Sequence, residues 1–455
     1  MSARANSPSG RDIAYHLHPY TNLVQHEKQG PHIITKGDGI YVIDDQGNRF
    51  IEGLAGLWCT SLGFSEPRLA DAAMRQLTTL PYYQSFAHRA TLPVIELAER
   101  LIKMAPTPMS KVFFTNSGSE ANDTQIKIAW YYHNAIGKPK KKKIISRRQG
   151  YHGVTVAAGS LTGMAYVQDS FDLPIDRVIH TDCPHYWLNA EPGESEEDFA
   201  TRMADNLEKL ILAEDPDTVA AFIAEPVQGA GGVILPPATY FAKVQEVLRR
   251  YDILFIADEV ICGFGRTGNM FGCETYDLEP DMITIAKALS SAYLPIGGAM
   301  VSEKVYEALR EESGRRGVFG TGYTYSGHPV CAAVAVETLK IYEERDILGH
   351  VREVAPRMQA RLAELAAHPL VGEARGVGLI GAVQLVRDKD KRALFDPARK
   401  VGALCMNKAV EHGLMVRALP GDSVAVCPPL IITEDEIDLL FDRLAKALDD
   451  TLAAL

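Results

Sequence analysis

Three charged side chains in this sequence each follow a short, nearly all-apolar run. Lys287, Asp258 and Glu225 stand directly after such runs, and each run predicts a buried β-strand. If the strands are parallel, the three side chains meet at one edge of a sheet, where open α/β sheets bind their ligands. A lysine in that position needs a reason, because lysine is almost never fully buried unless it is paired or chemically used.

One use removes the lysine charge altogether. The amine of Lys287 could condense with an aldehyde as a Schiff base, the standard role of lysine toward pyridoxal phosphate. Asp258 would then keep the nitrogen of the pyridine ring protonated, an interaction of ~4 kcal/mol before desolvation at ~4 Å and an effective dielectric of ~20. Two plainer interpretations stay open: Lys287 holds its amine in water, or it forms a structural salt bridge with Asp258.

Small residues at the start of a predicted helix suggest a phosphate site. Ser117, Gly118 and Ser119 follow an apolar strand, and Ser117 and Glu120 have the spacing of a capping box. Backbone N–H groups and the positive end of a helix bind phosphate, although a well-capped helix with no ligand has the same sequence. Tyr151, after another strand, could stack on a flat ring, and it could equally be a core tyrosine.

Two glycine motifs fit the G-x-G-x-x-G pattern of dinucleotide-binding proteins, at 263–268 and 376–381. That function requires a helix directly after the motif. The first motif is followed by a segment without helical periodicity, and the second by the alternating pattern of a strand. The sequence therefore argues against a nicotinamide cofactor, and it contains no P-loop, HExxH or G-x-S-x-G motif.

Alternating elements must position these residues. A hairpin is expected over 40–51, with helices from 67 to about 77, after Thr91, and over 238–250. Strands are expected at 111–114, 143–146, 219–224, 253–257 and 281–286, with helices between them. Such β-α-β units predict an α/β fold with a mostly parallel sheet covered by helices on both faces.

The two ends of the chain have a different texture. The first 30 or so residues suggest loose structure. A long helical pattern runs over 329–366, strand-like segments follow at 377–386 and 414–417, and Thr433 and Glu436 cap a last helix. We predict three parts: an N-terminal segment (1–60) joining a small domain, a large cofactor-binding domain (61–329), and a small α+β domain (330–455).

The composition of the 455 residues bounds the class of protein. Hydrophobic residues make up 46%, and the net charge of -11 argues against a nucleic-acid partner. The basic run 138–143 is interpreted as a solvated loop. Seven scattered cysteines without a CxxC pair predict neither disulfides nor a metal site. No apolar run is long enough for a membrane span or signal peptide, so we expect a soluble cytoplasmic protein and no membrane partner.

Taken together, the motifs resemble the class III pyridoxal-phosphate-dependent aminotransferases over about 31–433. The resemblance implies the fold type I architecture of that family, with a large domain, a mostly parallel sheet and a smaller α+β domain. It implies pyridoxal 5'-phosphate as cofactor and a homodimer, or a dimer of such dimers, with both active sites at the subunit interface. The resembling segments are 116–122, 151–153, 225–229, 258–260, 263–268, Lys287 and 324–329.

Residues 53–59 and 416–417 are similar to the ω-amino acid or amine:pyruvate branch of the family. That branch implies transfer of an amino group from a primary amine or ω-amino acid to a keto acid, in particular pyruvate, by a ping-pong mechanism. A decarboxylase, racemase or aminomutase on the same fold is the first alternative. A nicotinamide-dependent dehydrogenase is the alternative from another class.

The resemblance assigns the cofactor residues by position. Lys287 would bond the cofactor and shuttle the proton, Asp258 would pair with the ring nitrogen, and Glu225 would support the site. The remaining cofactor contacts would come from Gly118 and Ser119 at the phosphate, Tyr151 and Val260 on the ring faces, and Thr324 at the phosphate of the partner subunit.

The resemblance also assigns the substrate pocket. Arg417 would bind the carboxylate of the keto acid and swing aside for an amine without one. Trp58, Tyr151, Ala230 and the partner subunit's Phe86 would line the pocket. Since Ala230 and Phe86 are less polar than Thr and Tyr would be, we predict a roomy apolar pocket for bulky amines.

Overall fold

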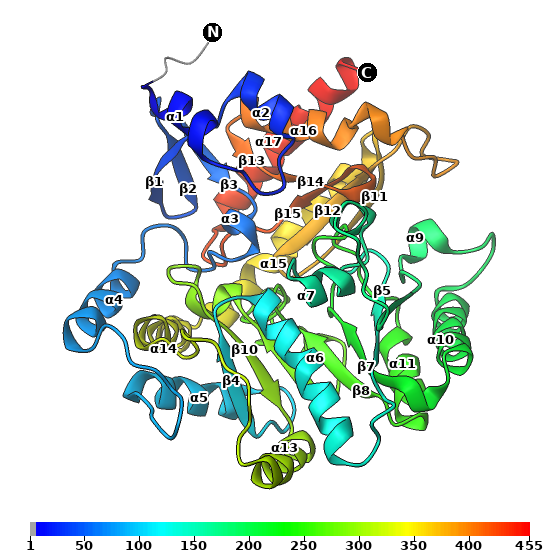
Figure 1. The fold of residues 1–455 in the computed structure, drawn as a ribbon. Coiled ribbons are helices and arrows are strands. Elements are labelled where there is room, and N and C mark those ends of the chain that lie inside the picture. The colour runs from blue at the N-terminus through cyan, green and yellow to red at the C-terminus, as the bar shows by residue number, and fades with distance from the viewer. Residues whose placement is uncertain (1–5) are drawn as a thin grey trace.

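The computed structural model describes residues 6–455 and contains three sheets within them (Figure 1). The central sheet has the strand order β4-β10-β9-β8-β7-β5-β6. Its strands are β4 (Lys111–Thr115), β5 (Lys143–Arg147), β6 (Val178–Thr181), β7 (Val219–Ala224), β8 (Leu254–Asp258), β9 (Met282–Ile285) and β10 (Gly297–Val301).

The predicted parallel sheet is confirmed for the five neighbouring strands β9, β8, β7, β5 and β6. Strand β10 runs antiparallel to both β4 and β9, so the sheet is mixed at that edge. Glycines begin β10, and a Cβ on Gly297 would lie 2.7 Å from the carbonyl oxygen of Ser117. The tight approach explains a glycine here, where the strand passes the start of the helix after β4.

Residues that alternate along the central strands belong to two different hydrophobic cores. Ile144 and Leu254 pack with apolar residues of α6 and α13, whereas their neighbours Ile145 and Phe255 pack with those of α10, α11 and α14. The prediction of helices on both faces is therefore confirmed. These helices are α6 (Gly118–Ala135), α10 (Glu196–Ala213), α11 (Tyr240–Arg250), α13 (Glu303–Arg316) and α14 (Pro329–Glu344).

Two smaller sheets lie together in the upper part of Figure 1, where both termini are found. The first contains the predicted hairpin, and Ile51 of its last strand pairs in parallel with Leu414 from the end of the chain. Its strands are β1 (Ile34–Asp38), β2 (Tyr41–Asp44), β3 (Arg49–Glu52) and β13 (Leu414–Met415). The second has the order β11 (Val371–Val377), β12 (Ile380–Leu385), β15 (Ser423–Val426) and β14 (Arg417–Leu419).

The second glycine motif forms the tight connection between β11 and β12, and Gly378 there has a φ of 56°. Gly376 and Gly381 pair with each other across this antiparallel hairpin. The first motif lies in turns and is followed by the four-residue α12 (Gly272–Thr275). Neither motif opens a helix in the way that a dinucleotide site requires.

The expectation of loose structure near the N-terminus was wrong for the described residues. Two short helices form there, α1 (Pro8–Tyr15) and α2 (Leu23–Gln29). Each has a side-chain cap: the Ser7 hydroxyl accepts from the Gly10 amide and the Asn22 side chain accepts from the Gln25 amide, both at 3.0 Å. Caps of this kind stabilise a helix end by about 1 kcal/mol, which matters for helices this short.

The long helical pattern over 329–366 is two helices, α14 and α15 (Ile347–Glu364). Asp346 separates them in a left-handed conformation with a φ of 46°, and its carboxylate accepts from the Gly349 amide at 3.1 Å. The capped last helix is confirmed as α17 (Glu434–Ala453), with reciprocal bonds between Thr433 and Glu436. Other helices are α3 (Ala55–Trp58), α4 (Pro67–Thr79), α5 (Leu92–Met104), α7 (Val156–Leu161), α8 (Ala165–Gln168), α9 (Tyr186–Asn189) and α16 (Val401–Glu411).

The interpretation of the basic run as a solvated loop was wrong for Lys141. This side chain is 2% exposed, and its Nζ donates to the backbone oxygens of Val219, Tyr251 and Asp252, each at 3.0 Å. Three carbonyl acceptors replace the water that a buried ammonium group loses. Lys141 therefore ties the start of β5 to the neighbouring strand and to the loop before β8.

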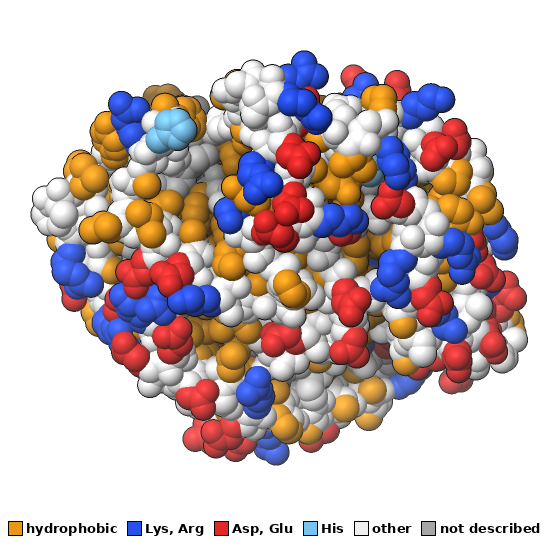
Figure 2. Space-filling view, turned by 90° about the horizontal axis from the view of Figure 1, so that it is seen from below, with side chains coloured by type: hydrophobic (Ala, Val, Ile, Leu, Met, Phe, Trp, Pro, Cys, Tyr) orange, Lys and Arg blue, Asp and Glu red, His pale blue; other side chains and the backbone are white. Residues whose placement is uncertain are grey.

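On the face shown in Figure 2, acidic and basic side chains are intermixed, with apolar areas between them. The seven cysteines are all free. Among residues 6–455, none of the helices combines the length and the apolar character that crossing a membrane would take.

Candidate active site

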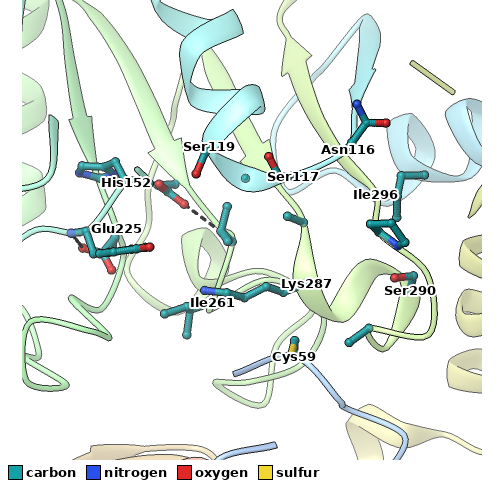
Figure 3. Close-up of a pocket in the computed structure, with 18 of the residues that line it drawn as sticks. Cys59, Asn116, Ser117, Ser119, His152, Glu225, Ile261, Lys287, Ser290 and Ile296 are labelled. Atoms are coloured by element: carbon teal, nitrogen blue, oxygen red, sulfur yellow. Dashed lines mark hydrogen bonds and ion pairs between the residues drawn. The ribbon is translucent and has the colours of Figure 1, made fainter. Parts of the chain in front are cut away.

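A cavity of about 410 Å³ opens at the carboxyl edge of the parallel strands. Glu225 after β7, Asp258 at the end of β8 and Lys287 after β9 all line it, as does Tyr151 from the loop after β5. The first turn of α6 forms another wall. Figure 3 shows Lys287 reaching across this pocket toward Ile261, with Ser117 and Ser119 on the opposite side and Glu225 and His152 at one end.

Lys287 sits in a left-handed backbone conformation with a φ of 48°. Burial lowers the pKa of its amine, against the opposite effects of neighbouring groups such as Cys59 and Asp258. Within residues 6–455 no ion pair joins Lys287 to Asp258, so the two do not form the plain salt bridge that the sequence left open. A buried amine with a lowered pKa is a better nucleophile at neutral pH, because more of it is unprotonated.

The Asp258 carboxylate is held by three donors and is 3% exposed. One oxygen, Oδ2, accepts from His152 Nδ1 at 2.7 Å and from Asn122 Nδ2 at 2.8 Å. The other, Oδ1, accepts from the Val260 amide at 3.1 Å. Donors from three different residues fix the direction of this carboxylate.

Asn122 connects Asp258 to two further elements. Its Nδ2 also donates to the backbone oxygen of His152 at 2.7 Å, and its Oδ1 accepts from the Thr284 hydroxyl on β9 at 2.8 Å. No role was predicted for Asn122 or His152. The signal was available, because Asn122 stands one helical turn after Gly118 and so shares its face of α6.

Glu225 fixes two loops at the edge of the pocket. Its carboxylate accepts from the Tyr151 amide at 2.9 Å and from the Gly229 amide at 3.1 Å. Burial raises the pKa of this carboxyl group. The Glu225 backbone oxygen accepts from the buried guanidinium of Arg147 at 2.6 Å. Glu225 is thus placed to hold Tyr151 over the pocket.

The start of α6 leaves room for a ligand. The Ser117 hydroxyl caps the helix by accepting from the Glu120 amide at 3.2 Å, but the Glu120 carboxylate accepts from Asn116 at 2.8 Å, so the predicted capping box is only half formed. A Cβ on Gly118 would lie 3.1 Å from Val260, and one on Gly153 would lie 2.4 Å from the Ser119 hydroxyl. Glycines here keep the start of α6 open, and backbone N–H groups at a helix N-terminus are suited to a phosphate such as that of pyridoxal phosphate.

Arg417, on β14, lies near this pocket without lining it. It is close enough to Tyr151 and Tyr20 to act electrostatically on both phenols. The N-terminal segment also reaches the site, since the Tyr20 hydroxyl donates to that of Tyr151 at 3.4 Å. In the part of the chain that the structure describes, no carboxylate forms an ion pair with Arg417.

Besides Arg417, four predicted substrate or cofactor residues do not line the pocket of a single chain. Trp58 is 3% exposed and packs in an apolar cluster with Ile261, which does line it. Ala230 follows the Gly229 amide that binds Glu225. Phe86 is 46% exposed and lines another cavity, of about 960 Å³, and Thr324 is an exposed residue whose backbone oxygen accepts from Tyr82.

Comparison with known proteins agrees with this geometry. Residues 23–448 match the family model for class-III aminotransferases. The mitochondrial gamma aminobutyrate transaminase 1 of Solanum lycopersicum is 52% identical over 436 residues, 96% of this chain and 84% of that protein.

Solved structures are similar as well. The omega transaminase of Pseudomonas jessenii in complex with PMP is 53% identical, with a TM-score of 0.97 over 99% of each chain. A thermostable omega transaminase variant engineered for asymmetric synthesis of enantiopure bulky amines has the same identity and TM-score, over 98% of this chain and all of that one. The chain therefore belongs to the class III aminotransferases, enzymes of fold type I that use pyridoxal phosphate to transfer an amino group to a keto acid.

Proposed function

We propose that this enzyme transfers the amino group of a primary amine or ω-amino acid to pyruvate, with Lys287 as the catalytic residue. The observation that carries the proposal is the meeting of Lys287, Asp258 and Glu225 at one cavity, with Arg417 beside it and without a carboxylate partner among residues 6–455. Bound pyridoxal phosphate supplies an aldehyde that takes up the amino group and a ring that accepts the electrons of a broken C–H bond.

Different residues around the cavity would hold different parts of this cofactor. Lys287 would bond the aldehyde carbon and, once released, move the proton at the reacting carbon of the substrate. Asp258, fixed by its three donors, would keep the ring nitrogen protonated. Gly118 and Ser119 would hold the phosphate at the start of α6.

The remaining assigned residues would hold the two faces of the ring. Tyr151 and Val260 both line the cavity, and each is tied to a carboxylate of the site. The Tyr151 amide donates to Glu225, and the Val260 amide donates to Asp258. Glu225 therefore acts as a positioning residue for Tyr151 rather than as a proton donor.

Arg417 would determine whether a substrate with a carboxylate binds. A guanidinium grips a carboxylate through two parallel hydrogen bonds, and Arg417 has no acidic partner among the described residues. An engineered relative carries the substitutions W58M, F86L and R417L for bulky amines. This chain has the same residue types at these numbers, which supports Trp58, Phe86 and Arg417 as pocket residues.

We also propose a homodimer whose subunits complete each other's sites. Phe86 and Thr324 are exposed and stand apart from Lys287 in one chain, as expected of residues that serve the partner's cofactor and substrate. The pairing of Ile51 with Leu414 supports grouping residues 1–60 with a small domain at 330–455, next to a large domain at 61–329. We also propose a cytoplasmic location for this chain, in contrast to the plant relatives that are named as mitochondrial or chloroplastic.

The test supplies amine and pyruvate together and measures both products. The amines are β-alanine, γ-aminobutyrate, a longer ω-amino acid and an arylethylamine, and the control is Lys287→Ala. We expect stoichiometric alanine and aldehyde or ketone with the wild type and neither with the variant. Loss of CO2 or inversion of an amino acid without exchange would instead identify a decarboxylase or racemase, and no adduct at Lys287 after borohydride reduction would reject the assignment.

The size of the substrate pocket has its own test. The small side chain of Ala230 is proposed to leave room for aryl or bulky alkyl amines. Ala230→Thr should lower turnover of the arylethylamine while leaving that of β-alanine unchanged. Equal turnover of the bulky amine by both enzymes would show that Ala230 does not set the limit.

A further inference from the structure

Three histidines surround one carboxylate in the N-terminal segment, away from the chemistry at Lys287. The Asp12 carboxylate contacts His18 Nε2 at 2.8 Å, His26 Nε2 at 3.0 Å and His16 Nδ1 at 3.1 Å. The rings also pack on one another, with centroids 4.1 Å apart for His16 and His18 and 4.2 Å apart for His18 and His26. Asp12 lies in α1, His26 lies in α2, and the other two occupy the connection between them.

The spacing of these nitrogen and oxygen atoms suits a metal ion. The ligand atoms of Asp12, His16 and His18 all lie within 4.8 Å of one another. His26 is not part of that group, but its Nε2 contacts the same oxygen of Asp12, Oδ2, as His18 does. In a tetrahedral zinc site with Zn–N bonds of about 2.0–2.1 Å, neighbouring ligand atoms are about 3.3 Å apart. The observed contacts of 2.8–3.1 Å between Asp12 and the histidine nitrogens would widen by a few tenths of an ångström to admit an ion, and the wider separations within the group, up to 4.8 Å, would close.

The nitrogen and oxygen atoms of this cluster indicate which kind of metal ion it would bind. Imidazole nitrogen with carboxylate oxygen suits Zn²⁺ and the neighbouring divalent transition metals, whereas Ca²⁺ and Mg²⁺ prefer sites made of oxygen alone. Three of the four side chains are partly buried: the side-chain exposures of Asp12, His18 and His26 are 20%, 24% and 10%. His16 is more open, at 59%. We propose that Asp12, His16, His18 and His26 form a binding site for one zinc-class divalent ion per chain.

Sequence reasoning missed this site because it searched for cysteine pairs, and because the four residues form no standard motif. The folding of α1 against α2 brings His26 back to Asp12, 14 residues earlier. The segment between α1 and α2 also contains Tyr20, whose hydroxyl donates to that of Tyr151 at the cavity. An ion bound at Asp12 would therefore fix the segment that brings Tyr20 to the pocket.

The experiment uses the full-length holoenzyme without a histidine tag. The protein is stripped with a chelator, dialysed against Zn²⁺ or Co²⁺, and its bound metal is counted by elemental mass spectrometry. We expect one ion per chain, and with Co²⁺ the strong visible absorption of a four-coordinate site. His18→Ala and His26→Ala should each weaken binding beyond the roughly 10- to 100-fold that loss of an outer-sphere partner costs.

The matched control is His412→Ala, which removes a histidine with a single carboxylate partner, Asp450, at 2.7 Å. This variant should keep one ion per chain. Retained cofactor absorbance in each variant shows that the fold survives. If the stripped enzyme takes up no metal, or if His18→Ala and His26→Ala bind as tightly as the wild type, the cluster is only a hydrogen-bonded cap and the proposal is overturned.

Discussion

Removing the side chain of Asn122 tests whether the support of Asp258 matters for catalysis. Asn122→Ala deletes two hydrogen bonds between neutral groups, to His152 and Thr284, and one to the Asp258 carboxylate. Neutral bonds contribute about 1 kcal/mol each and a bond to a charged group about 1.5–3 kcal/mol. The free energy of unfolding should therefore fall by about 3.5–5 kcal/mol in total.

The share that concerns Asp258 should appear in the reaction itself. If the carboxylate loses its direction, kcat/KM should fall by about 10- to 150-fold, which is the equivalent of 1.5–3 kcal/mol. Gln125→Ala is the matched control. Gln125 lies on the same helix, is equally buried, and donates from Nε2 to the Ile283 backbone oxygen at 2.9 Å, but it does not touch Asp258.

Two measurements separate the effects: urea unfolding followed by circular dichroism, and kcat/KM with saturating cofactor. Gln125→Ala should lose stability with little change in kcat/KM, whereas Asn122→Ala should lose both. If the two variants keep the same kcat/KM, Asn122 only packs the interior, and our account of Asp258 is wrong.

Three further predictions follow from buried charges and from the substrate site. Lys141→Met should lower the free energy of unfolding by about 2–4 kcal/mol, because three carbonyl groups lose their donor. The exposed control, Lys140→Met, should change that free energy by less than about 0.5 kcal/mol. Equal urea midpoints for the two variants would refute this prediction. Burial raises the pKa of Glu259 from 4.5 to about 7. Between these two pH values the folded state holds a proton that the unfolded state has lost. The free energy of unfolding of the wild type should therefore fall by about 3 kcal/mol as pH rises from about 4.5 to 7. Glu259→Gln should lack that loss, so a pH-independent difference in urea midpoint would contradict the shift. Arg417→Leu should raise KM for pyruvate by about 10- to 150-fold and leave the half-reaction with an amine that has no carboxylate unchanged, as stopped-flow absorbance would show.

Much of the central sheet was predictable because its signals are local. Apolar runs identified five of its strands, although not β6 or β10, and the charged residues after three of them identified the edge that carries the site. Alternation along the strands, as at Ile144 and Ile145, follows from the two-residue period of a strand. The reversal of β10 was not predictable, since it depends on pairing with β4, which is far away in the sequence, as well as with the nearby β9.

The parts that escaped prediction depend on tertiary partners. Lys141 resembles its exposed neighbours in sequence, and only the carbonyl groups of Val219, Tyr251 and Asp252 make it a buried residue. The helices α1 and α2 are too short to be recognised by periodicity. The sequence places Asn122 on the same face of α6 as Gly118, but its contacts with Asp258 and Thr284 become evident only when β8 and β9 lie beside that helix.

The groups around Asp258 come from distant parts of the sequence, and this determines when the site can form during synthesis. Asn122 is 136 residues from Asp258 and 162 from Thr284, so this contact set can close only after most of the chain has left the ribosome. A nascent or truncated chain without β9 has no means of retaining the coenzyme there. Yellow colour in a preparation is thus a gauge of how many molecules have completed their central sheet, and it offers a simple screen for damaging substitutions far from Lys287.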